Sequence, residues 1–116
     1  MISANDFRIV YVTTNSIESA AHISRIIVSE HLAACSTLIP NAISFFSWAD
    51  AINERHECIL MIKTGKDNIS KLFERIKELH HDEVPEILSV NIQDAYEPYL
   101  SWVNSTLSSV GNDIEN

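Results

Sequence analysis

The chain has 116 residues, a length that suits one compact domain and leaves no room for a second. Eight basic residues stand against sixteen acidic ones, and the formal net charge of −8 makes binding to nucleic acid or to an anionic membrane unfavourable. An apolar fraction of 46% excludes intrinsic disorder. Two cysteines are too few for a disulfide-stabilised secreted domain and, with no apolar stretch long enough for a signal peptide or a membrane span, they predict a cytoplasmic protein.

The N-terminal third of the chain predicts a strand followed by a helix. Residues 7–13 are β-branched and aromatic, which is typical of a buried strand. The polar residues 14–16 can cap a helix. Apolar residues then recur at helical spacing from Ile17, and the stripe continues to His31 near the expected C-terminal end of the helix.

A long hairpin is expected next, because two extended segments follow each other directly in the sequence. They cover about residues 34–48 and 54–63, and the chain turns near Asp50. Pro40 and Asn41 interrupt the first segment, so a bend or bulge is expected there. This hairpin is long for a domain of this size and would protrude from it.

The second half of the chain predicts a helix, a strand and a further helix. Residues 69–79 form an amphipathic helix, which ends before Pro85 because proline cannot continue it. A strand over 87–92 and a short helix over 96–107 follow. The polar tail 108–116 is expected to fray, which leaves a single domain, spanning 1–116, with an ordered core over about 7–107.

The order of elements predicts an α+β fold of the ferredoxin-like class. A βαββαβ order gives one antiparallel sheet with two helices on one face, here with an added C-terminal helix. The other face of the sheet stays uncovered. Four aromatic residues add more apolar surface than two helices can cover, so we expect them in the core or in an interface with further copies of the chain. They are Phe45, Phe46, Trp48 and Trp102.

Six short segments, each common by itself, occur in an order and spacing that is specific. They are Leu-Ala-Ala-Cys at 32–35, Leu-Ile-Pro at 38–40, Ser-Phe-Phe-Ser-Trp at 44–48, Ile-Lys-Thr at 62–64, His80 followed by Glu-Val-Pro-Glu-Ile at 83–87, and Tyr-Leu-Ser-Trp-Val at 99–103. With this set the chain resembles the CutA family, the divalent-cation tolerance proteins, over about residues 7–107.

The resemblance implies a ferredoxin-like subunit in a tight homotrimer that is built by intersubunit sheet pairing, similar to PII signalling proteins. It also implies an association with copper and divalent-cation tolerance, and it brings no established enzyme activity. This chain has Asn41 where the family has glycine, and asparagine tolerates a left-handed backbone better than most residues. It has Thr13 where some relatives have a metal-binding cysteine, which removes the soft ligand that copper prefers.

The densest group of potential metal ligands lies where the second helix ends. It comprises His80, His81, Asp82, Glu83 and Glu86. From these residues we predict a weak divalent-cation (copper) site at His80 and Glu83. The alternative is a polar helix exit without a ligand, and the spacing lacks the pattern of a tight structural metal site. We therefore predict no firmly bound cofactor.

Three further residues are candidates for a ligand-binding cleft between subunits: Lys63, Glu86 and Tyr99. Lys63 ends a strand among apolar residues, where it can neutralise Glu86 or receive an anionic ligand.

The leading hypothesis is a cytoplasmic, non-enzymatic, trimeric protein of divalent-cation tolerance that binds metal weakly or signals in the metal response. The first alternative is a PII-like sensor of a small anionic metabolite near Lys63. A small hydrolase or lyase that uses His80 with Glu83 or Glu86 is a second alternative, and a trimeric scaffold with an unknown protein partner is a third. The chain has no nucleophile motif and no glycine-rich phosphate loop to favour an enzyme or a nucleotide-binding protein.

Overall fold

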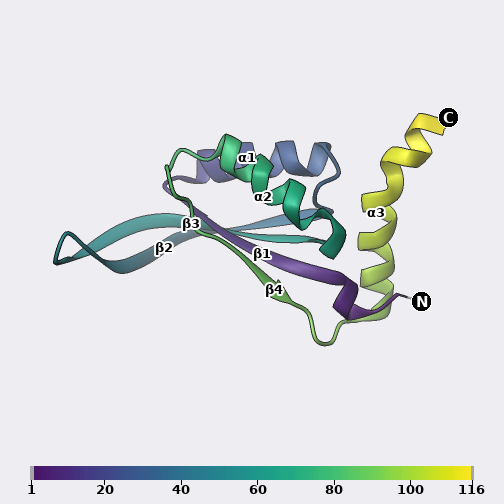
Figure 1. Ribbon diagram of the computed structural model, residues 1–116, viewed down its shortest axis with the longest axis horizontal. Helices are drawn as coiled ribbons and strands as arrows, with labels where there is room; N and C mark the ends of the chain where they lie inside the picture. Colours follow the sequence, from purple (N-terminus) through teal and green to yellow (C-terminus); the bar gives the residue numbers. More distant parts are fainter. Residues whose placement is uncertain (1, 116) are drawn as a thin grey trace.

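Four strands form one antiparallel sheet in the order β2-β3-β1-β4, and two helices cover one of its faces (Figure 1). The computed structural model describes residues 2–115, with side chains described as far as Ser108. The elements are β1 (Phe7–Thr14), α1 (Ile17–Ser29), β2 (Cys35–Trp48), β3 (Ala51–Gly65), α2 (Ile69–Leu79), β4 (Ile87–Asn91) and α3 (Glu97–Glu115). This order and topology confirm the predicted ferredoxin-like fold.

Helix α1 begins and ends at residues with specific backbone roles. The Ser16 hydroxyl accepts a hydrogen bond from the Ser19 N–H at 3.1 Å, which caps the first turn. At the other end His31 has a φ of 60°, in the left-handed region, and its N–H donates to the Val28 carbonyl. The left-handed residue stops the helix at Ser29, two residues earlier than the apolar stripe predicts.

The hairpin of β2 and β3 is the longest feature of the molecule, and its outer half extends well beyond the helices (Figure 1). We call residues 42–57, which lie beyond the bulge, the arm. At its tip Ala49 and Asp50 have φ values of 53° and 61°. Two consecutive left-handed residues make the tight turn whose twist matches that of paired strands.

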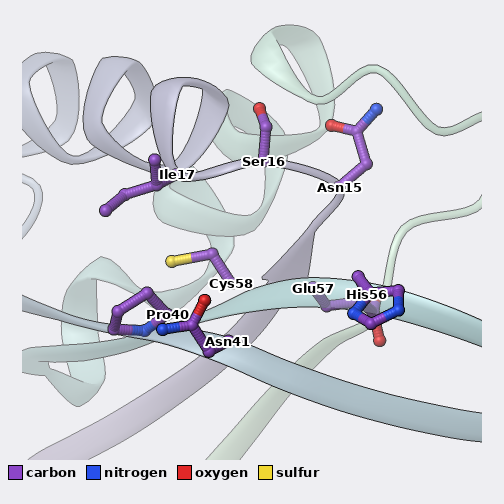
Figure 2. Close-up of a pocket in the computed structure, with 8 residues that line it drawn as sticks. All are labelled: Asn15, Ser16, Ile17, Pro40, Asn41, His56, Glu57 and Cys58. Atoms are coloured by element: carbon purple, nitrogen blue, oxygen red, sulfur yellow. The ribbon is translucent and has the colours of Figure 1, made fainter.

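A bulge separates the arm from the rest of the sheet, as Pro40 and Asn41 predict. Ile39 pairs with Ile59 and Ala42 pairs with Glu57, so two residues of β2 oppose the single residue Cys58. Asn41 has a φ of 63°, which confirms the left-handed backbone expected there. Figure 2 shows Pro40, Asn41 and Cys58 next to the start of α1.

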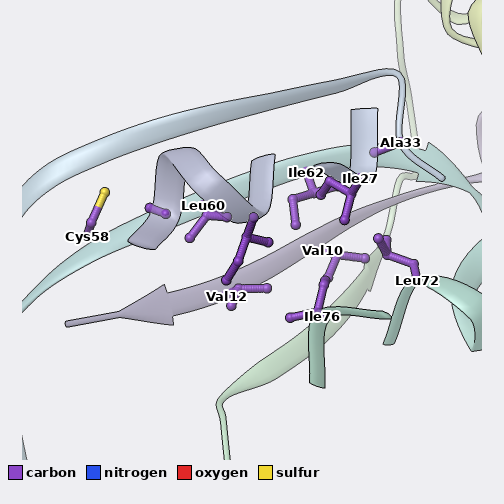
Figure 3. Close-up of a cluster of buried hydrophobic side chains, with 11 residues drawn as sticks. Val10, Val12, Ile27, Ala33, Cys58, Leu60, Ile62, Leu72 and Ile76 are labelled. Carbon is purple, nitrogen blue, oxygen red and sulfur yellow. The ribbon is translucent and has the colours of Figure 1, made fainter. Parts of the chain in front are cut away.

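The main core lies between the sheet and helices α1 and α2 (Figure 3). Alternate residues of the central strands face the helices, because successive side chains of a strand point to opposite faces. The buried members of this cluster are Val10, Val12, Ala20, Ile23, Ile27, Ala33, Cys58, Leu60, Ile62, Leu72 and Ile76. A second, smaller cluster joins the start of α3 to the start of β1 through Phe7, Ala34, Leu100 and Val103.

Helix α3 is longer than the sequence predicts, since its backbone stays helical to Glu115 instead of ending near residue 107. The side chains of the expected polar tail beyond Ser108, and Asn116 as a whole, lie outside the described residues. In the described part of the chain, no helix is both long enough and apolar enough to cross a bilayer.

The sheet face opposite α1 and α2 carries large apolar side chains at its surface. On this face Leu88 and Val90 of β4 pair with Tyr11 and Ile9 of β1, and both β4 residues are exposed. Four aromatic residues predicted for the core or an interface are likewise exposed in a single copy: Phe45, Phe46, Trp48 and Trp102. These residues are therefore not in the core of a single copy, and their place in an interface between copies stays a prediction.

Candidate functional site

His80 lies at the end of α2, and both nitrogens of its ring are engaged. Nε2 lies 2.7 Å from the backbone oxygen of Thr13, and Nδ1 accepts a hydrogen bond from the Asp82 N–H at 3.0 Å. A carbonyl can only accept and an N–H can only donate, so the ring carries its proton on Nε2. In this arrangement neither nitrogen of His80 has a lone pair free for a metal ion.

Asp82 anchors the loop that follows α2 to the arm. Arg55 of β3 donates two hydrogen bonds to its carboxylate, at 2.9 and 3.3 Å. The paired carboxylate raises the pKa of the Arg55 guanidinium, with a smaller contribution from Glu57. The Nε of Arg55 also lies 3.5 Å from the Glu57 carboxylate. One guanidinium thus serves two carboxylates.

These residues line a pocket of about 340 Å³ at the base of the arm, which we call the arm-base pocket. Its walls include Thr13, Arg55, Glu57, Asp82 and Glu86. Three carboxylate residues and one guanidinium residue line it, so the pocket carries an excess of negative charge. The side chain of Glu57 is only 7% exposed, and among the described residues Arg55 is the partner of its carboxylate. The pocket is therefore suited to a cation and opposed to an anion.

Glu83, the other predicted metal ligand, faces elsewhere. It lines a separate and mostly apolar pocket between α2 and the following loop, together with Phe73 and Val84. Within the described part of the chain, no hydrogen bond or ion pair joins Glu83 to His80, and no three His, Cys, Asp or Glu side chains are arranged to hold an ion. The pairing of His80 with Glu83 stays a prediction.

The predicted cleft residues separate into two places. Lys63 pairs with Ile9 and Cys35 in the sheet, and its ammonium donates to the Thr37 hydroxyl at 2.6 Å. Tyr99 of α3 lies beside Cys35; burial, and then the neighbouring Cys35, raises the pKa of its phenol. Glu86 instead lines the arm-base pocket, at the other end of β4's pairing with β1. Among the described residues, the contacts of the Lys63 ammonium are with Thr37 and Met61, and none is an ion pair with Glu86.

The sequence interpretation missed Arg55 and Glu57. A signal for them existed, since residues 55 and 57 alternate along an expected strand and therefore share a face. The strand pattern could not indicate the partner of Arg55, because Asp82 lies 27 positions away, in a loop.

A further pocket of about 400 Å³ lies between the start of α1 and the bulge (Figure 2). The Cys58 thiol faces this space, and burial raises its pKa, which keeps the thiol protonated and a poor nucleophile. The Ser16 hydroxyl is already used as the cap of α1. These two groups therefore give the pocket no activated nucleophile.

Comparison with known proteins identifies relatives over most of the chain. The family model of the CutA1 divalent ion tolerance protein matches residues 8–106. The divalent-cation tolerance protein CutA of Thermus thermophilus is 37% identical over 95 residues, which cover 82% of this chain and 92% of that protein. Protein CutA of Mus musculus is 35% identical over 88% of this chain, and the chain spans 58% of the mouse protein's length.

Solved structures agree with the sequence comparison. CutA from Xylella fastidiosa superposes with a TM-score of 0.85 at 33% identity and covers 88% of this chain and 98% of that one. CutA1 from Ehrlichia chaffeensis gives a TM-score of 0.85 at 28% identity, over 90% of this chain and 98% of that chain.

Proposed function

Since the chain belongs to the CutA1 divalent-ion tolerance family, we propose that it acts, without catalysis, in the cellular response to divalent cations, as a homotrimer that binds such a cation weakly. The observation that carries the cation part of this proposal is the arm-base pocket, with its excess of carboxylates and its buried Glu57. The observation that supports assembly is the uncovered apolar face of the sheet.

Assembly is supported by the distribution of exposed apolar side chains on the arm. Phe46 and Trp48 lie on the open face of the sheet, whereas Ile43, Phe45 and Ile52 lie on the opposite face of the same hairpin. Trp48 is 71% exposed and Ile52 is 84% exposed in a single copy. Apolar surface on both faces of a protruding hairpin favours an arm that is enclosed by other copies of the chain.

The donor set of the arm-base pocket favours weak binding of a cation that accepts oxygen ligands. Glu57, Asp82 and Glu86 offer carboxylate oxygens, which suit harder cations than copper. In the described part of the chain no three such side chains are already arranged around one point, so a cation would have to draw them together. Thr13 offers a hydroxyl where copper would prefer a thiolate, and Asp82 is already paired with Arg55. A cation therefore competes with Arg55, which is the physical reason to expect low affinity.

Two measurements test the proposal. Light scattering at micromolar concentration should give the mass of three chains; a folded monomer would contradict the assembly. Calorimetry should detect weak binding of Zn²⁺ or Cu²⁺ that Glu57→Gln together with Glu86→Gln abolishes. The matched comparison is Glu83→Ala, which removes a ligand predicted from the sequence that lines a different pocket and should leave the heat unchanged. Equal heats for all three proteins would contradict a cation site in this part of the molecule.

A second candidate function, the sensing of a small anionic metabolite, is favoured by the environment of Lys63. In the described part of the chain this ammonium is held by the Thr37 hydroxyl and the Met61 carbonyl and has no carboxylate partner. An unpaired cation beside the hydroxyl of Thr37 suits an anion. Thermal-shift screening of nucleotides and carboxylates, with Lys63→Gln as the control variant, separates this candidate from the first.

A further inference from the structure

The loop between α2 and β4 is held by polar contacts at two points. At its start, the His80 imidazole bridges the Thr13 carbonyl and the Asp82 N–H, at 2.7 and 3.0 Å. Two residues later, the Asp82 carboxylate takes both hydrogen bonds from Arg55. A single line of contacts thus runs from the end of β1, through His80 and Asp82, to the arm.

The carbonyl of Thr13 needs a side-chain donor because the pairing of β1 with β4 ends before this residue. The last pair between β1 and β4 is Val12 with Ile87, one residue before Thr13. Beyond that pair β4 no longer lies alongside β1, and the Thr13 carbonyl accepts its hydrogen bond from His80 instead. Thr13 is 9% exposed, so a carbonyl without a partner would be costly at this place.

We propose that His80 is a positioning residue for the arm-base pocket: its neutral imidazole ties the loop to the end of β1 and so holds Asp82 and Glu86 in the wall of the pocket. The role in cation binding rests on the proposed function, whereas the two hydrogen bonds of the His80 ring do not depend on a cation. It reassigns His80, because a ring with both nitrogens in hydrogen bonds supports ligands without being one.

The neighbouring residue His81 provides a matched control. It is exposed, whereas His80 is partly buried, and no hydrogen bond or ion pair of the His81 side chain occurs in the described part of the chain. The two histidines are adjacent in sequence and equal in chemistry, and they differ in burial and in these contacts. A role that depends on the contacts must therefore be lost in His80 variants and kept in His81→Ala.

The test uses the full chain and its variants His80→Ala, His80→Gln and His81→Ala. Nitrogen-15 NMR of the wild-type imidazole should show a neutral ring with its proton on Nε2. Hydrogen exchange of the Asp82 amide should accelerate at least tenfold in His80→Ala and stay unchanged in His81→Ala. Zn²⁺ affinity should fall about 10- to 100-fold in His80→Ala, the range found when a group that orients ligands is removed.

His80→Gln separates positioning from direct ligation. The glutamine amide can still donate to the Thr13 carbonyl, so we expect it to restore most of the Zn²⁺ affinity. The proposal is overturned if the proton lies on Nδ1, if Asp82 exchange is the same in His80→Ala, or if Zn²⁺ moves the His80 nitrogen signals to metal-bound positions while Gln behaves like Ala. If the wild type binds no Zn²⁺, the cation proposal fails, and the NMR and exchange results still decide the role of His80.

Discussion

Arg55 and Asp82 lie 27 residues apart in sequence, and the Arg55 guanidinium donates two hydrogen bonds of 2.9 and 3.3 Å to the Asp82 carboxylate. The same guanidinium is the cation beside the buried Glu57. Removing Arg55 therefore has two consequences, the loss of the loop contact and a buried carboxylate without a counter-charge.

We expect Arg55→Met to lower the free energy of unfolding by about 2–4 kcal/mol, because an uncompensated buried charge is costly. Asp82→Asn should cost about 1 kcal/mol or less, since both partners of that pair are partly exposed. Urea denaturation of the two variants measures the difference. Adding Glu57→Gln to Arg55→Met should recover part of the loss, and no recovery would show that Glu57 does not depend on Arg55.

The Cys58 thiol should resist alkylation in the folded protein. Burial raises its pKa, so the folded state holds the proton at a pH at which the unfolded thiol loses it. This contribution to stability is present below the thiol's ordinary pKa and is lost as the pH rises through the raised value. In Cys35→Ser, where Cys58 is the single thiol, the iodoacetamide rate should follow unfolding. A rate like that of a free cysteine at neutral pH would contradict the burial.

His31→Gly should stabilise the chain by about 1 kcal/mol, because glycine adopts a left-handed backbone without a steric cost. His31 has a φ of 60°, and its Nδ1 is buried with no hydrogen-bond partner among the described residues. Thermal unfolding of the variant measures the gain. The matched control is Ser29→Gly, two residues earlier at the end of α1, which should destabilise by about 1 kcal/mol. Equal signs for the two changes would refute the explanation.

The turn at the tip of the arm should also respond to residues with left-handed preference. Replacing Ala49 by Asn and Asp50 by Gly supplies the pair that this turn favours. We expect a gain of about 1 kcal/mol in the free energy of unfolding, from chemical denaturation of the double variant. A loss would show that the native turn residues make contacts that the single copy does not contain.

Trp48→Ser should weaken assembly and leave the fold of the subunit unchanged. Trp48 is 71% exposed in one copy, so its removal opens no cavity there. If other copies cover it, the concentration at which the assembly dissociates should rise at least tenfold by light scattering, with an unchanged circular dichroism spectrum. Val84→Ser is the control, since Val84 is 88% exposed but lies off the arm. Identical dissociation of the two variants would argue against an enclosed arm.

The candidate site was predictable only in part. His80, Asp82 and Glu86 stand out in the sequence as a cluster of polar residues before and after Pro85. Their roles depend on groups from other elements: the Thr13 carbonyl of β1 for His80, and Arg55 of β3 for Asp82. Backbone atoms carry no sequence signal, and a pairing over 27 positions leaves no local pattern.

The helices and strands and their order along the chain follow from local sequence patterns. Strand and helix periodicity, the Ser16 cap and the bulge at Pro40 and Asn41 are local properties, since they depend on neighbours within a few residues along the chain. The six short segments that resemble the CutA family are local as well, so the resemblance was visible in the sequence. Tertiary structure decided which imidazole is engaged, which carboxylate is buried and which aromatic residues remain exposed. These outcomes depend on contacts between distant elements. A buried polar side chain stabilises the fold when it has a hydrogen-bond partner and destabilises it when it has none.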